Sequence, residues 1–303
     1  MSPSGADPDL GARTADLAER ALLALDGLES LAVEVALEAG RLITHERPAG
    51  LGPSATKSSP TDVVTVMDTR SEELIRERLL AARPHDGVLG EEGDDHVGTS
   101  GITWVVDPID GTVNYLYEIP AYAVSIAAVT GDPRVAGEWQ VLAAAVGDPS
   151  RGLVYHATKG AGARCSVVPT GTASDGGDAH GRTSRVLHVG DVDDLGSALV
   201  GTGFGYTRER RLTQAELLLK VLPEIRDIRR IGSAALDLCA VAAGQLDGFF
   251  EIGLNPWDLA GGWLVVTEAG GVVTGPGGGA PDAHLTVAGN PAVHAALSAV
   301  VDR

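Results

Sequence analysis

The first strong pattern in the chain is helical and lies near its amino end. Between Arg13 and His45, apolar residues recur every three or four positions, at Leu17, Ala21, Leu25, Leu28, Leu31, Val35, Ala39 and Leu42. This spacing places them on one face of an amphipathic helix, which follows a polar tail over residues 1–10. Gly27 lies inside the run, and it is a candidate break between two helices because glycine lowers helix propensity.

A second helix and a group of strands are predicted next. Residues 47–62 are rich in Pro, Gly, Ser and Thr and predict a loop, and a helix follows from Ser71 to Ala82, where Pro84 limits it. Short β-type runs separated by turn residues then predict strands at Gly87–Leu89, Thr103–Val106, Ala121–Val129, Val141–Val146 and Leu153–His156. Because turns join these runs, we expect an antiparallel sheet.

The pattern changes beyond residues 169–184, a low-complexity stretch that predicts an exposed, mobile loop. Strands and helices then alternate, at Ala198–Thr202, Gln214–Val221, Ile225–Arg230, Ala234–Ala243, Gly248–Ile252, Trp257–Ala269, Val272–Val273, Leu285–Val287 and Pro291–Val300. This alternation is typical of a layered α/β arrangement. We therefore expect an α+β half over residues 1–170 and an α/β half over residues 185–303, packed together as one compact unit.

Charge and composition exclude several classes of function. The 303 residues include 41 acidic and 23 basic ones, so the net charge is −18. This balance argues against binding to nucleic acids and to anionic membrane surfaces, which need clustered lysine and arginine. No apolar run approaches the roughly 20 residues that span a bilayer, and no secretory leader is visible. Cys165 and Cys239 form no disulfide framework, so the expected compartment is the cytoplasm.

The most informative chemistry lies in residues 104–120. Asp107 and Asp110 are three positions apart, and we expect the strand before them to end there, because Pro108 cannot continue a central ladder. The turn can aim both carboxylates and the carbonyl of Ile109 at one point. Gly111 and Thr112 then offer backbone N–H groups at the start of a short helix, where phosphate is favoured. The plainer interpretation of this segment alone is an Asx-rich turn that caps a helix.

Three further acidic positions change that balance. Glu91 follows a short strand, Asp258 lies in the first turn of a helix, and Asp68 opens another helix. Taken singly, a solvated turn and two helix caps would explain them. Together with Asp107 and Asp110, they fit a magnesium-assisted phosphoryl-transfer site, because Mg²⁺ prefers carboxylate and carbonyl oxygens. The histidines are scattered and suggest no zinc site.

The motifs that carry this chemistry resemble the inositol monophosphatase family. They are GEEG (90–93), WVVDPIDGTVNY (104–115) and NPWDLAGGWLVVTEAGG (255–271), and the resemblance continues through KSSPTDVVTVMD (57–68) and RRIGSAALDLCAVAAG (229–244). It covers residues 40–290. It implies the layered αβαβα sugar-phosphatase fold of the inositol monophosphatase and fructose-1,6-bisphosphatase superfamily. It also implies a homodimer, a requirement for roughly two to three Mg²⁺ ions, and sensitivity to lithium.

The resemblance further implies roles for individual residues. Implied metal ligands are Glu91, Asp107, the carbonyl of Ile109, Asp110 and Asp258, with Asp68 linked through water to a third, weaker ion. Glu91, Thr112 and Asp68 are the implied catalytic residues. Implied substrate contacts are Asp110, Gly111, Thr112, Gly232, Ser233, Ala234 and Glu251, and Lys57 falls in a mobile loop near the metals. The chain departs from the family pattern at Asn255-Pro256, at residues 93–101 and at residues 169–184, which hold none of these residues.

The expected activity is hydrolysis of inositol 1-phosphate to inositol and phosphate by a metal-activated water. The motif has no nucleophilic Ser, Cys or His, so a covalent phosphoenzyme is not expected. Glu251 favours a polyol, because a carboxylate accepts hydrogen bonds from hydroxyls. Alternative substrates within the superfamily are 3′-phosphoadenosine 5′-phosphate, fructose 1,6-bisphosphate and histidinol phosphate. A regulatory interaction protein is the alternative of another class. The expected partner is a small phosphate ester, with neither nucleic acid nor membrane.

Overall fold

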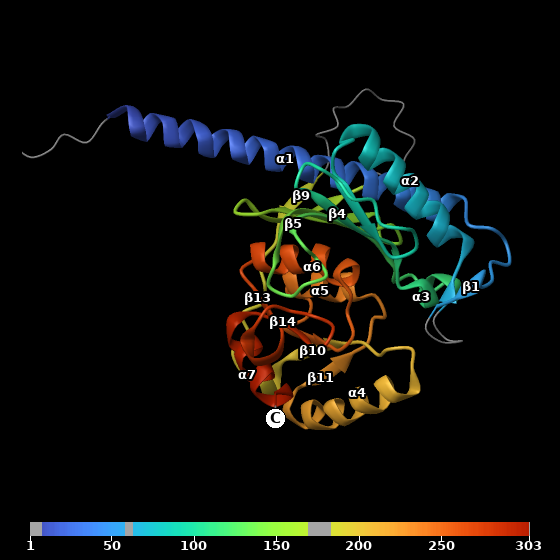
Figure 1. The fold of residues 1–303 in the computed structure, drawn as a ribbon. Coiled ribbons are helices and arrows are strands. Elements are labelled where there is room, and N and C mark those ends of the chain that lie inside the picture. Colours follow the sequence, from blue (N-terminus) through green and yellow to red (C-terminus); the bar gives the residue numbers. More distant parts are fainter. Residues whose placement is uncertain (1–7, 58–62, 169–182, 303) are drawn as a thin grey trace, which may run out of the picture.

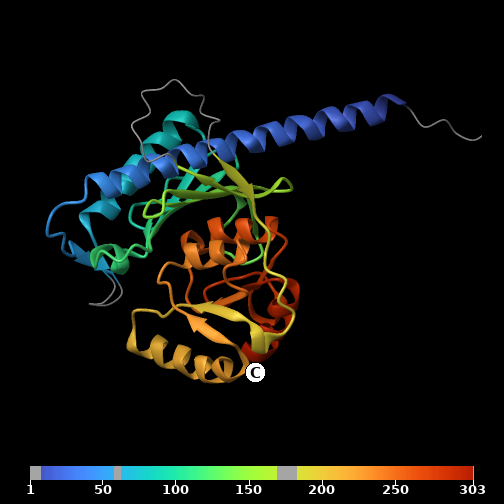
Figure 2. The same cartoon turned by 180° about the vertical axis from the view of Figure 1, so that it is seen from behind.

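Two β-sheets and three helical layers make up the protein, as shown by a computed structural model that describes residues 8–57, 63–168 and 183–302 (Figure 1). Helices α1 (Pro8–His45) and α2 (Val66–Ala82) cover one face of a seven-stranded sheet. Helices α5 (Ala234–Ala242) and α6 (Pro256–Glu268) fill the space between this sheet and a five-stranded one. Helices α4 (Arg208–Val221) and α7 (Pro291–Val301) cover the far face of the second sheet (Figure 2). This order of layers confirms the αβαβα fold.

The larger sheet is mostly antiparallel and has one parallel edge. Its strands follow chain order: β3 (Gly87–Gly90), β4 (Thr103–Asp110), β5 (Ala123–Gly131), β6 (Trp139–Asp148), β7 (Leu153–Thr158), β8 (Gly162–Val167) and β9 (Ser184–Val186). Strand β3 pairs parallel to β4, whereas all later neighbours pair antiparallel, so the expectation of an antiparallel sheet is wrong at this edge. The short helix α3 (Thr112–Leu116) follows β4, and a small hairpin of β1 (Ala55–Thr56) and β2 (Val63–Val64) precedes α2.

The smaller sheet is mixed, in the order β11-β10-β12-β14-β13. Its strands are β10 (Leu199–Thr202), β11 (Asp227–Arg229), β12 (Gly248–Glu251), β13 (Val272–Thr274) and β14 (Thr286–Gly289). Strand β10 lies parallel to β11 and β12, and β14 lies antiparallel to β12 and β13. Three short 3₁₀ turns complete the described elements, at Leu195–Ser197, Leu222–Glu224 and Pro276–Gly278. The proposed division of the chain into halves at residues 170–185 stays a prediction.

Among the described residues, the buried side chains form three cores between the layers. One joins α1 and α2 to the large sheet, a second joins that sheet to α5, α6 and the small sheet, and a third lies beneath α4 and α7. The inner strand β5 is buried on both faces: Val124 and Ile126 contact the first core, while Ala123 and Ala127 contact the second. This explains why the strand is a continuous apolar run without polar alternation.

Several predicted boundaries change. Helix α1 begins at Pro8, inside the expected tail, and continues without interruption through Gly27. Gly27 is exposed, and the helix needs no side chain there for packing. Helix α2 begins at Val66, because Thr65 caps it, and α4 begins six residues before the predicted start. The expected loop at 169–184 lies outside the described residues except for its last two, and Ser184 opens strand β9.

Strand β4 runs past Pro108, where we expected it to end. Strand β3 pairs only with Thr103–Val106, so the missing N–H of Pro108 meets no neighbour on that side. On the β5 side the register shifts between Asp107 and Asp110, which leaves the two residues between them outside the regular ladder. The irregularity therefore accommodates the proline, and Asp107 and Asp110 lie at its two ends, each still paired with β5.

In the described part of the chain, no helix is both long and apolar enough to cross a membrane.

Candidate metal and phosphate site

Three carboxylates converge where strand β4 meets helix α6. Asp107 and Asp110 flank the irregularity in β4, and Asp258 lies in the first turn of α6. One oxygen of each lies within 4.8 Å of the others. The fold thus brings together two sequence motifs that are about 150 residues apart in the chain. The predicted convergence of Asp107, Asp110 and Asp258 is present in the geometry.

Hydrogen bonds from α5 and from the β4 turn hold Asp110 and Asp107 in place. Oδ2 of Asp110 accepts from Ser233 Oγ at 2.6 Å and from the backbone N–H of Ala235 at 2.7 Å. Oδ1 of Asp107 accepts from the backbone N–H of Ile109 at 3.0 Å. The start of α5 therefore fixes one carboxylate, and the turn of β4 fixes the other.

Asp258 and Asp68 act as helix caps and also face the site. Capping and a role in the site are therefore compatible for both residues. Asp258 Oδ2 accepts from the N–H of Asn255 at 2.7 Å, and Asp68 Oδ2 accepts from the N–H and the hydroxyl of Thr65 at 2.8 and 2.6 Å. The caps orient each carboxylate along its helix start. Oδ1 of Asp68 lies 3.0 Å from Thr112 Oγ1 on α3.

Thr112 links this acid to the backbone of the β4 turn. Its Oγ1 lies 3.0 Å from the carbonyl oxygen of Ile109 as well as from Asp68. Gly111 precedes it with φ = 95°, a conformation that favours glycine, and a Cβ there would lie 3.0 Å from the carbonyl oxygens of Ala121 and Gly232. Only glycine fits this position without displacing its neighbours.

Glu91 lies directly after β3 and contacts Lys57. The Lys57 Nζ atom lies 2.6 Å from Glu91 Oε1 and 2.5 Å from Glu92 Oε1. Burial alone lowers the pKa of Lys57, but the charges of Glu91 and Glu92 raise it overall. Lys57 therefore stays a cation and balances part of the acidic charge.

Burial and mutual repulsion raise the pKa values of the acidic cluster. Burial, and then the charges of Glu91 and Asp110, raise the pKa of Asp107 and of Asp258 well above the usual range. Burial likewise raises the pKa of Glu91 to about 7, although Lys57 opposes the shift. Burial also raises the pKa of Asp110 and Asp68, against the hydrogen bonds they accept.

This donor set fits a divalent cation. Within the described residues, Asp107, Asp110 and Asp258 form no salt bridge with a lysine, arginine or histidine. Buried like charges without a partner are costly, and a cation between them removes the cost. Carboxylate oxygens are the ligands of magnesium and calcium, and neither cysteine nor histidine joins the cluster.

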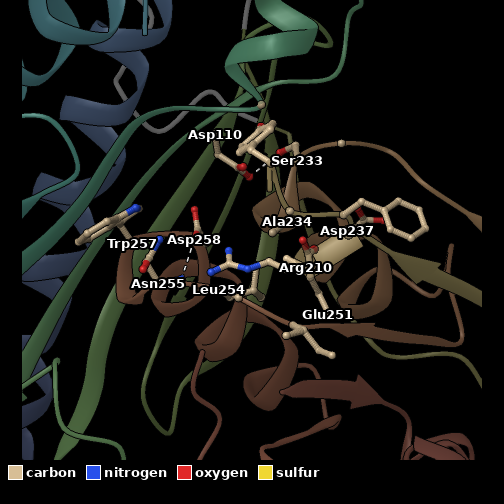
Figure 3. Close-up of a pocket in the computed structure, with 18 of the residues that line it drawn as sticks. Asp110, Arg210, Ser233, Ala234, Asp237, Glu251, Leu254, Asn255, Trp257 and Asp258 are labelled. Carbon is tan, nitrogen blue, oxygen red and sulfur yellow. Dashed lines mark hydrogen bonds between the residues drawn. The ribbon is translucent and has the colours of Figure 1, made fainter. Parts of the chain in front are cut away.

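A cavity of about 350 Å³ opens beside the cluster (Figure 3). Its wall includes the following predicted residues: Lys57, Glu91, Asp110, Gly111, Gly232, Ser233, Ala234, Glu251 and Asp258. Asp68, Asp107, Ile109 and Thr112 are not among the lining residues. The cluster and the hydrogen bonds above nevertheless connect them to the same place.

Three charged residues of the cavity wall were not predicted: Arg210, Arg230 and Asp237. Arg210 projects from α4 into the cavity, and Asp237 lies on α5, where burial and the charges of Glu251 and Asp110 raise its pKa to about 9 (Figure 3). The sequence signal for Asp237 was a single acid inside the apolar run 234–243. No pattern singled out Arg210, because arginine on an exposed helix is ordinary.

Comparisons with known proteins agree on one family. A model described as the inositol monophosphatase family matches residues 24–302. The chain is 47% identical over 265 residues to inositol-1-monophosphatase of Mycobacterium leprae, covering 84% of this chain and 83% of that protein. It is 38% identical over 275 residues to Nus factor SuhB of Escherichia coli, covering 89% and 94%. Among solved structures it is similar to Mycobacterium tuberculosis SuhB, with a TM-score of 0.71 and 43% identity over 92% of this chain and 96% of that one.

Proposed function

The chain belongs to the inositol monophosphatase family, and we propose that it is a Mg²⁺-dependent enzyme that hydrolyses inositol 1-phosphate to inositol and phosphate. Its relatives named inositol-1-monophosphatase are phosphatases, and this chain is an enzyme of that class. The observation that carries the proposal is the cluster of Asp107, Asp110 and Asp258 beside a cavity that also contains Glu251.

Five groups would hold roughly two Mg²⁺ ions: the carboxylates of Glu91, Asp107, Asp110 and Asp258 and the carbonyl of Ile109. Asp68 would contribute to a third, weaker position through water. When bound, the ions supply positive charge that lowers the pKa of a coordinated water and stabilises the reacting phosphate. The proposal includes competition between Li⁺ and Mg²⁺ for this weaker position.

The chain's own groups bind the phosphate and handle the proton. We assign phosphate binding to the backbone N–H groups at Gly111 and Thr112, where α3 begins. Glu91 and the hydroxyl of Thr112 orient the attacking water, and Glu91 accepts its proton. The water oxygen bonds to phosphorus as the ester P–O bond breaks, and the inositol oxygen leaves as an alkoxide that takes up a proton from solvent. Burial raises the pKa of Glu91 to about 7 in the metal-free protein, and the bound ions would favour its charged form, which is the form that accepts a proton.

The other end of the cavity is suited to a polyol. Glu251 ends strand β12 and faces the cavity with Asp237 and the turn Gly232–Ala234. Burial, together with the charge of Asp110, raises the pKa of Glu251 to about 8. Hydroxyls can donate to this group in its charged form and can also accept from it in its neutral form.

Arg210 and Arg230 favour a second candidate function. Both line the cavity, and a guanidinium binds a phosphate well. A substrate with a second anionic group, such as fructose 1,6-bisphosphate or 3′-phosphoadenosine 5′-phosphate, would use them. We rank this behind inositol 1-phosphate because Glu251 and Asp237 bring acidic charge to the same wall.

The remaining parts of the proposal concern the protein's surroundings. We propose a homodimer in the cytoplasm that acts on a small phosphate ester and binds neither membranes nor nucleic acid. The relative from Escherichia coli carries the name Nus factor, which suggests a regulatory interaction as an alternative role. The convergence of Asp107, Asp110 and Asp258 supports an enzyme over an inactive scaffold.

A substrate panel with the purified chain tests the proposal. Inositol 1-phosphate, fructose 1,6-bisphosphate, 3′-phosphoadenosine 5′-phosphate, histidinol phosphate and glycerol 2-phosphate are compared by phosphate release with Mg²⁺ and with chelator. The expected result is the highest kcat/KM for inositol 1-phosphate and no turnover in chelator. A preference for a bisphosphate would select the second candidate, and full turnover in chelator would overturn the metal-dependent mechanism.

A further inference from the structure

One face of helix α2 contacts three different segments of the site. Asp68, Ser71 and Glu72 are buried. Ser71 and Glu72 follow Asp68 by three and four residues, so all three lie on the same side of the helix. Asp68 contacts Thr112, and Ser71 Oγ donates to the carbonyl oxygen of Pro108 at 3.2 Å. Glu72 contacts the turn that carries Glu91. Helix α2 thus supports the α3 start, the β4 irregularity and the 90–93 turn at once.

The Glu72 carboxylate binds that turn with both oxygens. Oε2 accepts from the backbone N–H of Glu92 and Oε1 from the backbone N–H of Gly93, each at 2.8 Å. Arg76 Nε also donates to Oε1 at 2.8 Å, and only 2% of the Glu72 surface is exposed. Charged hydrogen bonds of this kind are stronger than neutral ones. The turn is therefore held by a buried, charge-balanced acceptor.

Two glycines allow this close approach. A Cβ at Gly90 would overlap Glu72 Oε1, and a Cβ at Gly93 would lie 2.7 Å from the same oxygen. Neither glycine has the positive φ that would itself require glycine. The glycines in GEEG are thus explained by the space that the Glu72 carboxylate occupies.

We propose that Glu72 is a positioning residue: its carboxylate holds the turn Gly90–Gly93 so that Glu91 faces the cluster of Asp107, Asp110 and Asp258. This inference rests on the proposed function for its catalytic consequence. Glu91 is flanked by the end of β3 on one side and by the two bound N–H groups on the other. Without Glu72, the turn would keep its attachment to β3 and the ion pairs of Lys57 with Glu91 and Glu92, but its backbone N–H groups at Glu92 and Gly93 would lose their acceptor.

The test compares Glu72→Gln with Glu73→Gln. Glutamine keeps the shape but offers one acceptor oxygen, so its NH₂ group must face either the Glu92 N–H or both the Gly93 N–H and Arg76. Glu73 is the next residue on α2 and is exposed, so its variant is the matched control. The first measurement is hydrogen exchange of the Glu92 and Gly93 amides in the protein with chelator. We expect exchange to be about tenfold faster in Glu72→Gln and unchanged in the control.

The second measurement is the Mg²⁺ concentration at half of the metal-induced shift in Tm, with steady-state kinetics on the same samples. We expect that concentration to rise about tenfold, turnover at saturating substrate to slow by about 10- to 100-fold, and KM to change less than about threefold. Glu72→Asp keeps the charge and should recover part of the metal affinity. Unchanged exchange and unchanged metal affinity in folded Glu72→Gln would overturn the proposal.

The wild-type protein provides a test that needs no variant. In chelator, the amides of Glu92 and Gly93 should exchange at least about tenfold more slowly than those of Asp94 and Asp95, and equal rates would overturn the proposal. The exchange data do not depend on catalysis. Slow exchange lost in Glu72→Gln, in a protein without phosphatase activity, would support the positioning role and reject the proposed function.

Discussion

The acidic residues of the site reduce the stability of the metal-free protein. Burial and neighbouring charges raise the pKa of Asp107 and Asp258, so the folded state favours their neutral form. The unfolded chain exposes these groups to water and ionises them freely. A metal ion restores the balance by favouring the charged form. Function and stability therefore make opposite demands on the same side chains.

Asp107→Asn should raise the stability of the metal-free protein and lower its activity with Mg²⁺. Asparagine keeps the shape and removes the charge, so we expect a higher Tm in chelator. We also expect kcat/KM to fall at least about 100-fold, since several kcal/mol of charge stabilisation depend on the metal. Thermal unfolding in chelator and steady-state kinetics with Mg²⁺ measure the two effects. Wild-type activity in the variant would exclude Asp107 as a ligand.

Asp237 should make the stability of the metal-free protein depend on pH. Burial and the charges of Glu251 and Asp110 raise its pKa from 3.8 to about 9. Between these values the folded state binds a proton that the unfolded state releases, so the free energy of unfolding falls as pH rises from about 4 to about 9. Asp237→Asn removes this contribution. The Tm of the variant relative to wild type should therefore increase steadily over that pH range, and a constant difference would contradict the shifted pKa.

Glu251→Gln tests how the cavity binds a polyol. Burial and the charge of Asp110 raise the pKa of Glu251 to about 8 in the metal-free protein, so the charged form dominates only above that pH. Hydrogen bonds to a charged acceptor contribute about 1.5–3 kcal/mol, so kcat/KM for inositol 1-phosphate should fall about 10- to 150-fold at pH 9. The loss should shrink toward pH 6, and it should be smaller for glycerol 2-phosphate. Equal losses on both substrates at every pH would mean that Glu251 only supports the fold.

At the scale of elements, α6 is packed closely on two sides. A Cβ at Gly261 would lie 2.6 Å from Ser125 Oγ on β5, and a Cβ at Gly262 would lie 2.5 Å from the Leu238 side chain on α5. The two glycines thus let the helix that carries Asp258 sit between the large sheet and its neighbouring helix. Because neither glycine has a side chain, α6 can pack closely enough to bring Asp258 near β4.

Gly262→Ala and Gly27→Ala should therefore have opposite effects on stability. Alanine at 262 gains up to about 1 kcal/mol of helix propensity but overpacks against Leu238, so we expect a net loss of about 1–3 kcal/mol. Alanine at 27 meets no atom within 4 Å and should gain up to about 1 kcal/mol. Chemical denaturation of both variants measures the difference. Stabilisation by Gly262→Ala would show that α6 can move away from α5 freely.

Local patterns predicted most elements, and long-range pairing decided the rest. The periodicity of α1 and the strand runs of β4 to β7 are local features, so they were visible in the chain. The passage of β4 through Pro108 was not, because it depends on where β3 ends and on the register of β5. Strands β8 and β9 were missed because they lack apolar runs, and their partners across the sheet stabilise them.

In the site, too, local motifs were predictable from the sequence and residues that act through long-range contacts were not. Asp107, Ile109, Asp110, Gly111 and Thr112 form one local motif, so their neighbourhood could be read directly. The roles of Arg210 and Glu72 depend on contacts with segments about 20 to 50 residues away, and each is an ordinary helix residue by composition. Physical reasoning from the residues alone could not have found them without the fold.

At the scale of the whole molecule, the acidic cluster joins separate layers. Asp107 and Asp110 belong to the large sheet, Asp258 belongs to the helical layer between the sheets, and Ser233 and Ala235 tie Asp110 to α5 of that same layer. The net charge of −18 adds a general repulsion to the local one. A cation bound at this point should therefore stabilise the fold as a whole and not only one loop.

Mg²⁺ should raise the Tm of the chain, and the effect should require the cluster. A ligand at 100 times its Kd stabilises the folded state by about 2.7 kcal/mol, which for a chain of this size corresponds to an increase of several degrees. Thermal unfolding is measured in chelator, in MgCl₂, and in NaCl of the same ionic strength, because salt alone screens the net negative charge. We expect NaCl to produce only a small part of the shift. Asp258→Asn should lose the Mg²⁺-specific part while keeping the response to NaCl. An equal shift in both salts, or a full Mg²⁺ shift in Asp258→Asn, would place the stabilising cation elsewhere on the acidic surface.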